Sequence, residues 1–156
     1  KLNHLYFGKA GHLFFFFFFL LRGWNVAIRE VDIGDDIFVV KDDQGILKKV
    51  QVKSSTLKSY GNAVKAVINI KKSQITATSQ VYFIFPIRKN NKWLPPFIIQ
   101  GLDLYEIIKD NNRRFFSTTT ESVTLNLMFK HNKFYLYKQN FSRYKENYRD
   151  FPILTH

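Results

Sequence analysis

Three polar side chains, Asp36, Gln51 and Lys53, lie in a segment whose pattern predicts a β-hairpin. Residues 36–53 contain two runs of β-branched and aromatic residues, separated by a polar turn at 42–45 that holds two Asp and a Gly. This turn would place Asp36 opposite Gln51, with Cβ atoms about 4.5–5.5 Å apart. Lys53 shares the face of Gln51, because side chains alternate along a strand. The hairpin therefore brings together a carboxylate, an amide and an ammonium group.

Such a group has the chemistry that metal-dependent cleavage of a phosphodiester requires. A hard divalent cation needs oxygen ligands and open positions for water and a phosphate oxygen. Asp36, the Gln51 amide and the backbone carbonyl of Val52 offer three oxygens, and Lys53 can hold the attacking water or the phosphate and stabilise the developing charge. The alternative is an exposed Asp36–Lys53 ion pair of little energetic weight, and the three residues by themselves favour that alternative.

The charge distribution points to a polyanionic partner. The 156-residue chain carries a net charge of +12, six of its twelve acidic residues lie at 30–43, and 44–102 contains none. An acidic cluster in a basic field suits a polyanionic partner, most simply nucleic acid. The candidate phosphate contacts are Lys58, Lys65, Lys71 and Lys72. A lysine-rich strand face exposed to solvent is the alternative reading.

The length and composition of the chain exclude several classes of protein. The length predicts a single domain over 1–156. The chain has no cysteine, which excludes disulfides, thiol nucleophiles and zinc–thiolate sites and agrees with a cytoplasmic location. The longest apolar run, at 13–21, is less than half of the roughly 20 residues that a membrane span needs. We therefore expect no membrane contact.

The surrounding segments predict an α/β or α+β domain. A helix at 9–22 ends at Gly23, and its six consecutive phenylalanines, 14–19, indicate packing on most sides, against a sheet and against something else such as a second subunit. Residues 1–8 are expected to be a lead-in, and 54–62 a loop. Strands are expected at 24–30, 36–41, 46–53, 63–71, 81–88, 97–100, 122–129 and 133–137, a helix or turn at 73–79, and helices at 102–110 and 142–150. Pro86 suggests an edge strand or a bulge at 81–88.

The order of motifs in residues 9–55 resembles that of a known family. Lys9-Ala10-Gly11-His12 opens the helix, Arg22–Val26 leads to the first strand, Asp32–Ile37 carries the aspartate, and Gln51-Val52-Lys53 follows. This order is similar to that of the PD-(D/E)XK nuclease superfamily, and within it to the archaeal-type Holliday junction resolvases and related small endonucleases.

The resemblance implies a restriction-endonuclease-like core, with the N-terminal helix packed on a central mixed β-sheet and further helices around it. It also implies cleavage of DNA with Mg²⁺ or Mn²⁺, and a homodimer. Asp36 matches the metal-binding aspartate, Gln51 the acidic ligand and Lys53 the lysine that serves the water. Gln51 departs from the usual glutamate. His12 stands where many members have a helix glutamate, so the possible auxiliaries are His12, Asp32 and Ser55.

Three hypotheses follow from the sequence. The first is a metal-dependent DNA endonuclease that uses Asp36, Gln51 and Lys53. The second is a catalytically degenerate DNA-binding module with the same fold, for which affinity falls as salt rises and no turnover occurs. The third is an interaction protein that oligomerises through the phenylalanine run and a tyrosine-rich C-terminal half.

Overall fold

The computed structural model describes residues 2–28, 36–41, 45–112 and 119–154, which form an α+β structure. The helices are α1 (Leu2–Leu21) and α2 (Gly101–Asn111), and η2 (Lys72–Gln74) and η4 (Ser142–Tyr144) are 3₁₀ turns. The strands are β1 (Asn25–Ile28), β2 (Asp36–Lys41), β3 (Ile46–Val52), β4 (Ser55–Thr56), β5 (Lys58–Tyr60), β6 (Ala63–Lys71), β7 (Val81–Phe85), β8 (Ile87–Lys89), β9 (Lys92–Trp93), β10 (Phe97–Gln100), β11 (Ser122–Lys130), β12 (Lys133–Leu136) and β13 (Gln139–Asn140).

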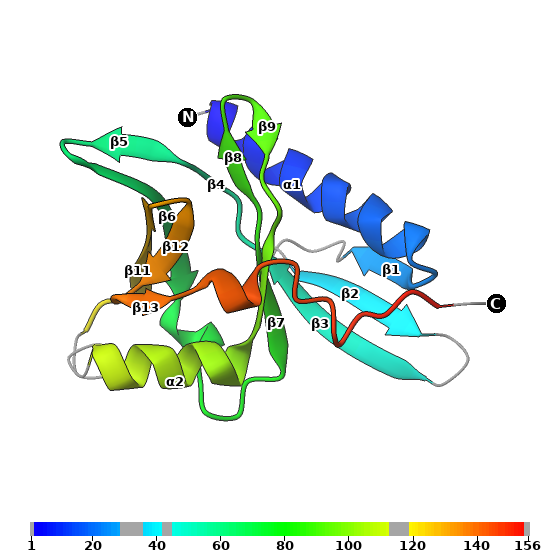
Figure 1. Cartoon of the computed structure of the whole chain (residues 1–156). Helices are drawn as coiled ribbons and strands as arrows, with labels where there is room; N and C mark the ends of the chain where they lie inside the picture. Colours follow the sequence, from blue (N-terminus) through cyan, green and yellow to red (C-terminus); the bar gives the residue numbers. More distant parts are fainter. Residues whose placement is uncertain (1, 29–35, 42–44, 113–118, 155–156) are drawn as a thin grey trace.

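A mixed five-stranded sheet with the order β1-β2-β3-β7-β10 forms the centre of the fold (Figure 1). Its β3–β7 pair is parallel and its other pairs are antiparallel. A parallel pair needs a long crossover, and here β4, β5 and β6 lie within it. The expected mixed sheet with an N-terminal helix is confirmed.

Two hydrophobic cores lie on opposite faces of this sheet. On one face, Phe15 and Phe19 of α1 pack with Val50, Val52 and Ile84. The larger core, on the other face, joins the central sheet to α2 and to a second, antiparallel sheet with the order β13-β12-β11-β6-β5. Figure 1 shows α1 on one side of β3 and β7, with α2 and the second sheet on the other. The central sheet is therefore covered on both faces at β7 and β10, whereas β1 is largely exposed.

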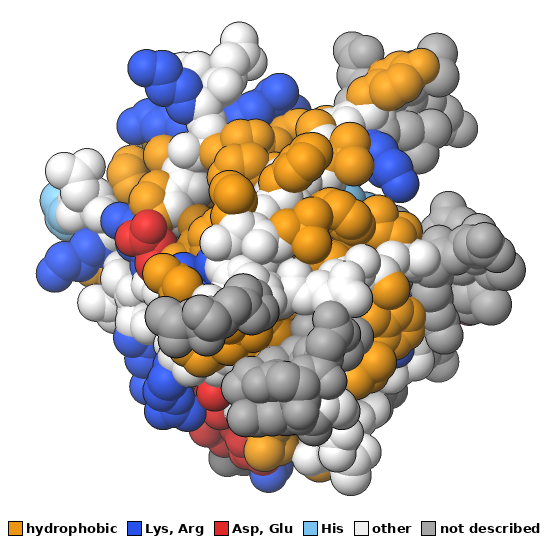
Figure 2. Space-filling view, turned by 90° about the vertical axis from the view of Figure 1, so that its right-hand side faces the viewer, with side chains coloured by type: hydrophobic (Ala, Val, Ile, Leu, Met, Phe, Trp, Pro, Cys, Tyr) orange, Lys and Arg blue, Asp and Glu red, His pale blue; other side chains and the backbone are white. Residues whose placement is uncertain are grey.

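Helix α1 begins at Leu2, so the expected lead-in at 1–8 is wrong for the described residues of that segment. The phenylalanine run is covered on one side only: Phe15 and Phe19, one turn apart, are buried, whereas Phe14 and Phe17 are 44% and 63% exposed. Figure 2 shows hydrophobic side chains gathered on this side of the molecule. No helix of the described part of the chain is long and apolar enough to cross a membrane.

Two expectations around the crossover are wrong. The predicted loop at 54–62 contains β4, which pairs with β8, and β5, which forms a hairpin with β6. Strand β7 lies inside the central sheet and not at its edge. Pro86 falls where the chain leaves this sheet for the three-stranded sheet β4-β8-β9, and its carbonyl accepts a hydrogen bond from the Ser55 N–H. Proline is tolerated there because it interrupts no ladder.

The predicted closing helix at 142–150 is also wrong. Helical structure ends at Tyr144, and Glu146 has a φ of 51°, which a right-handed helix does not allow. The segment bonds instead to the start of β10: the Glu146 N–H donates to the Pro96 carbonyl, and Lys145 forms a bridge with Phe97. Tertiary hydrogen bonds have thus replaced helical ones.

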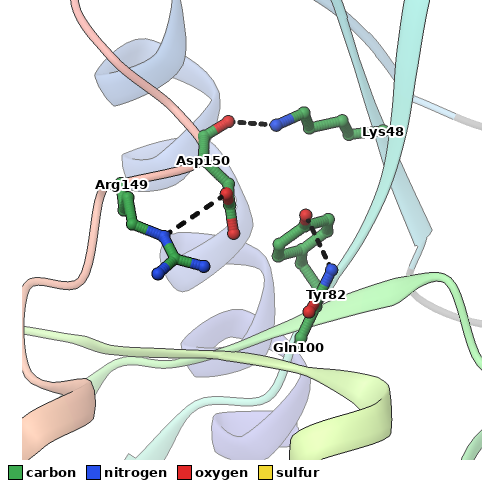
Figure 3. A network of polar contacts seen from close by, with 5 residues as sticks. All are labelled: Lys48, Tyr82, Gln100, Arg149 and Asp150. Atoms are coloured by element: carbon green, nitrogen blue, oxygen red, sulfur yellow. Dashed lines mark hydrogen bonds and ion pairs between the residues drawn. The ribbon is translucent and has the colours of Figure 1, made fainter.

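The C-terminal segment then crosses the central sheet on the face that α1 covers. Trp24 Nε1 donates to the Pro152 carbonyl at 2.8 Å, and Arg22 Nε to the Phe151 carbonyl at 2.9 Å. Lys48 donates to the Asp150 carbonyl, as Figure 3 shows, and its ammonium lies 4.8 Å from the centre of the Phe151 ring. Burial lowers the pKa of Lys48 below its usual value, although the Asp150 carboxylate opposes that shift. These contacts hold residues 150–152 against the end of α1, Trp24 and β3.

Candidate functional site

The predicted hairpin forms with the predicted register. Strands β2 and β3 pair antiparallel, and Asp36 lies opposite Gln51. The side chain of Gln51 is completely buried. By alternation it faces away from Val50 and Val52, which pack against α1, and on the parallel neighbour β7 it lies opposite Phe83 of the larger core. A polar amide is therefore held in the interior beside the backbone position of Asp36.

Helix α1 reaches the end of β3 through His12. Its Nε2 lies 3.3 Å from the backbone carbonyl oxygen of Val52, the carbonyl expected to bind a cation. A carbonyl oxygen has two lone pairs, so a hydrogen bond from the Nε2–H tautomer leaves one for another partner. The resemblance in motif order suggested His12 as an auxiliary residue, and the structure places its ring beside the Val52 carbonyl. Asp32 lies outside the described residues.

A glycine allows this close approach of α1 to β3. A Cβ built on Gly11 would lie 2.0 Å from Ser54 Oγ, too close for any real contact, and 3.4 Å from Ser54 Cβ. Ser54 follows Lys53 directly, and its Oγ is buried without a hydrogen-bond partner in the part of the chain that the structure describes. Gly11 and Ser54 thus set the distance between the helix and the end of the strand.

Replacing Gly11 by alanine should therefore destabilise the protein by about 1–3 kcal/mol, because the added methyl group overlaps Ser54 Oγ. Gly8 is the matched control: a Cβ there meets nothing within 4 Å, so Gly8→Ala should stabilise by about 1 kcal/mol through helix propensity. Urea unfolding measures both effects. Adding Ser54→Ala to Gly11→Ala should restore the stability; a double variant as unstable as Gly11→Ala would show that this contact does not matter.

Lys53 follows β3 directly and is held by its backbone. Its N–H donates to the Ile84 carbonyl at 2.9 Å, which continues the β3–β7 ladder by one residue. Its side chain is half-buried. Lys49 stands on the same face of β3, two residues before Gln51, so lysines flank the buried amide on both sides. Lys49 was not among the residues predicted for the site, although the same alternation that placed Lys53 indicates it as well.

Ser55 links the end of this strand to β6. Its buried hydroxyl donates to the Val67 carbonyl at 2.8 Å. The middle of β6 therefore passes directly beside the segment that follows Lys53. The observed hydrogen bond shows that the Ser55 hydroxyl connects β4 to β6. A contact of Ser55 with phosphate stays a prediction.

The four predicted phosphate contacts lie at two ends of β6. Lys58 on β5 and Lys65 on β6 are directly paired, and the Lys65 ammonium lies 4.8 Å from the centre of the Tyr60 ring. Lys71 and Lys72 stand at the other end of β6, about 20 Å from Lys65 for a strand that rises 3.3 Å per residue. These lysines therefore form two pairs, one near each end of β6, and not one cluster.

The donor set suits a hard cation. The structure offers the amide oxygen of Gln51 and the carbonyl of Val52 beside the backbone position of Asp36, and these are the oxygen groups that Mg²⁺ and Mn²⁺ prefer. Within the described ranges no three His, Cys, Asp or Glu residues cluster as a metal site. Of the three proposed oxygen ligands, Asp36 is a carboxylate, whereas the Gln51 amide and the Val52 carbonyl are neutral.

The contact between Gly11 and Ser54 was not predicted from the sequence. The available signal was a glycine inside a helix, which costs about 1 kcal/mol relative to alanine and often has a packing reason. Its partner, 43 positions along the chain, has no comparable signal.

Comparison with known proteins supports the fold. The chain is similar to the solved structure of a bacterial homing endonuclease, I-Ssp6803I, with a TM-score of 0.55 and 19% identity over 92% of this chain and 86% of that one. No protein-family model matches the chain. A search of curated proteins also found no match. The chain therefore has a nuclease-like fold.

Proposed function

We propose that this protein is a divalent-metal-dependent DNA endonuclease of the PD-(D/E)XK type, with its centre at the paired ends of β2 and β3. The observation that carries the proposal is the pairing of Asp36 with the buried Gln51, one residue before the Val52 carbonyl and two before Lys53. The endonuclease whose fold the chain shares adds support. Gln51 is also fully buried, which is unusual for a polar side chain and marks this position as a special one.

In the proposed mechanism each group has one task. Asp36, the Gln51 amide oxygen and the Val52 carbonyl would hold Mg²⁺ or Mn²⁺, and the bound cation would supply Lewis-acid chemistry. Lys53 orients the attacking water and donates to a phosphate oxygen, which stabilises the negative charge of the transition state. His12 keeps the Val52 peptide in place. The water oxygen bonds to phosphorus as the P–O bond to the leaving oxygen breaks, and the proton that the water loses ends on that leaving oxygen, so the products are a phosphate monoester and a hydroxyl.

A cleavage assay with supercoiled, linear and branched DNA tests this function. With Mg²⁺ or Mn²⁺ the protein should cut at least one of these substrates, and EDTA should stop the reaction reversibly. Binding that weakens linearly in log K with log salt, without any cutting in either metal, would instead support a degenerate DNA-binding module.

We also propose that a second copy of the chain covers the open side of α1. Leu13, Phe14, Phe17, Leu20 and Leu21 are exposed there. No charged residue occurs at 10–21, so two helices can pack there without repulsion despite the net charge of +12. Sedimentation equilibrium should give twice the 18.5 kDa chain mass, and Phe17→Glu should give the monomer. A monomeric wild type would contradict the dimer.

A further inference from the structure

The second sheet leaves one face open to solvent, and that face is polar and basic. Its other face is buried in the larger core through alternate residues such as Ile68 and Leu125. The open positions form cross-strand rows: Lys71 with Ser122, Asn69 with Thr124, Val67 with Asn126, and Lys65 with both Met128 and Lys58. None of the five strands contains Asp or Glu. An antiparallel sheet often has one solvated face, so further features must decide whether this one binds a ligand.

The first such feature is an oriented amide. Thr124 Oγ1 donates to Asn69 Oδ1 at 2.7 Å, and both residues are exposed. The hydroxyl occupies one lone pair of Oδ1 and fixes which end of the amide is the acceptor and which is the donor. The side chain therefore presents a preset acceptor–donor edge to the solvent. Such an edge matches the N6 donor and N7 acceptor of adenine in the major groove.

The second feature is a pair of like charges on the projecting β5–β6 hairpin. Lys58 and Lys65 occupy directly opposed positions, where two like charges destabilise a sheet. A phosphate between the two ammonium groups would remove that repulsion. Figure 1 shows that this hairpin extends away from the body of the molecule.

The dimensions agree with a DNA groove. Strands β6 and β11 pair over 64–71 and 122–129, so their paired length is about 26 Å for a rise of about 3.3 Å per residue. The major groove is about 12 Å wide and admits a two-stranded β-ribbon. We propose that the open face of β6 and β11 lies in the major groove of duplex DNA, where Asn69, held by Thr124, reads adenine and Lys58 and Lys65 contact phosphates.

This inference rests on the proposed action on DNA, but its test does not require cutting. The wild-type protein in EDTA is used to select sequences from a random duplex pool, and the variants are then measured against the selected sequence. We expect an adenine at one fixed position, and Asn69→Ala should weaken binding to that sequence about 10- to 100-fold with little effect on unrelated duplexes. Lys58→Ala should weaken binding to all sequences and reduce the salt slope by about one unit.

Replacements of Thr124 by side chains of similar size distinguish a role in recognising adenine from a role in packing the sheet. Thr124→Val keeps the shape and the strand propensity but removes the hydroxyl, so the adenine preference should relax, whereas Thr124→Ser should keep it. Gln80→Ala, an exposed amide outside the second sheet, is the control and should change nothing. Thermal unfolding confirms that each variant is folded.

The outcomes distinguish the two proposals. The proposed DNA-recognition face, with Asn69 held by Thr124, is called the reading surface here. If Asn69→Ala and Thr124→Val keep the wild-type preference for adenine, the proposal of this reading surface is wrong. Cleavage in Mg²⁺ would still leave the endonuclease proposal intact. If the adenine preference depends on both residues but the wild type never cuts, the reading surface stands and the endonuclease proposal fails. No duplex binding at low salt would overturn the reading surface.

Discussion

Replacing Lys53 by alanine is expected to lower the rate of DNA cleavage by at least about 10²-fold, the usual loss when a group that stabilises developing charge is removed. The fold should remain, because the side chain is only half-buried and the backbone hydrogen bond from the Lys53 N–H to the Ile84 carbonyl is kept in the variant. Duplex affinity should change little. Single-turnover cleavage with Mg²⁺ measures the rate, and a binding assay measures the affinity.

Lys109→Ala is the matched control for that experiment. Lys109 is an exposed lysine on α2 whose ammonium pairs with Glu106 at 3.5 Å, away from the proposed centre. Its removal should leave the cleavage rate unchanged. A Lys53→Ala protein that cuts as fast as the control would show that the mechanism assigned to Lys53 is wrong.

Replacing Gln51 by glutamate is expected to increase the affinity for Mg²⁺ and to decrease the stability of the metal-free protein. The new carboxylate adds the charge that the site lacks, so half-maximal cleavage should need less Mg²⁺. Without metal, a carboxylate at a completely buried position should lower the free energy of unfolding by about 1–3 kcal/mol or more. Mg²⁺ should then raise the Tm of Gln51→Glu more than that of the wild type.

Gln74→Glu provides a control of the same chemistry. The Gln74 amide oxygen is also buried, but it lies on η2 and not at the β2–β3 pair. This variant should lose stability without gaining a response to Mg²⁺. An equal Mg²⁺ response of the two variants would indicate non-specific binding and would contradict a metal site at Gln51.

The central hairpin could be predicted in detail because local rules determine it. Alternation in 36–41 and 46–52, with a turn at 42–45, specifies which residues pair, and the observed partners of Asp36 and Lys41 are the expected ones. The strand at 63–71 has the predicted bounds, and the segment at 122–137 forms the predicted hairpin. In β6 and β11 buried and more exposed residues alternate, so the sequence of these strands carries a recognisable period of two.

The errors fall where distant contacts override local pattern. The segment 142–150 has a composition that suits a helix, but Glu146 bonds to the Pro96 carbonyl and turns with a positive φ. Strand β4 exists because Ser55 bonds to Pro86, 31 positions away. The contacts of His12 with Val52 and of Gly11 with Ser54 are equally non-local, so only the resemblance to a family indicated a role for His12, and nothing indicated one for Ser54.

The most direct test of the proposed metal site is the dependence of cleavage on Asp36. Asp36→Asn keeps the size of the side chain and removes the single matched carboxylate, and Asp110→Asn, an exposed position on α2, is its control. Cleavage of supercoiled DNA is measured across a titration of Mg²⁺ and Mn²⁺. We predict that the wild type and Asp110→Asn cut with the same metal dependence, and that Asp36→Asn does not cut at any metal concentration. Cleavage by Asp36→Asn at the wild-type rate and metal concentration would contradict the account.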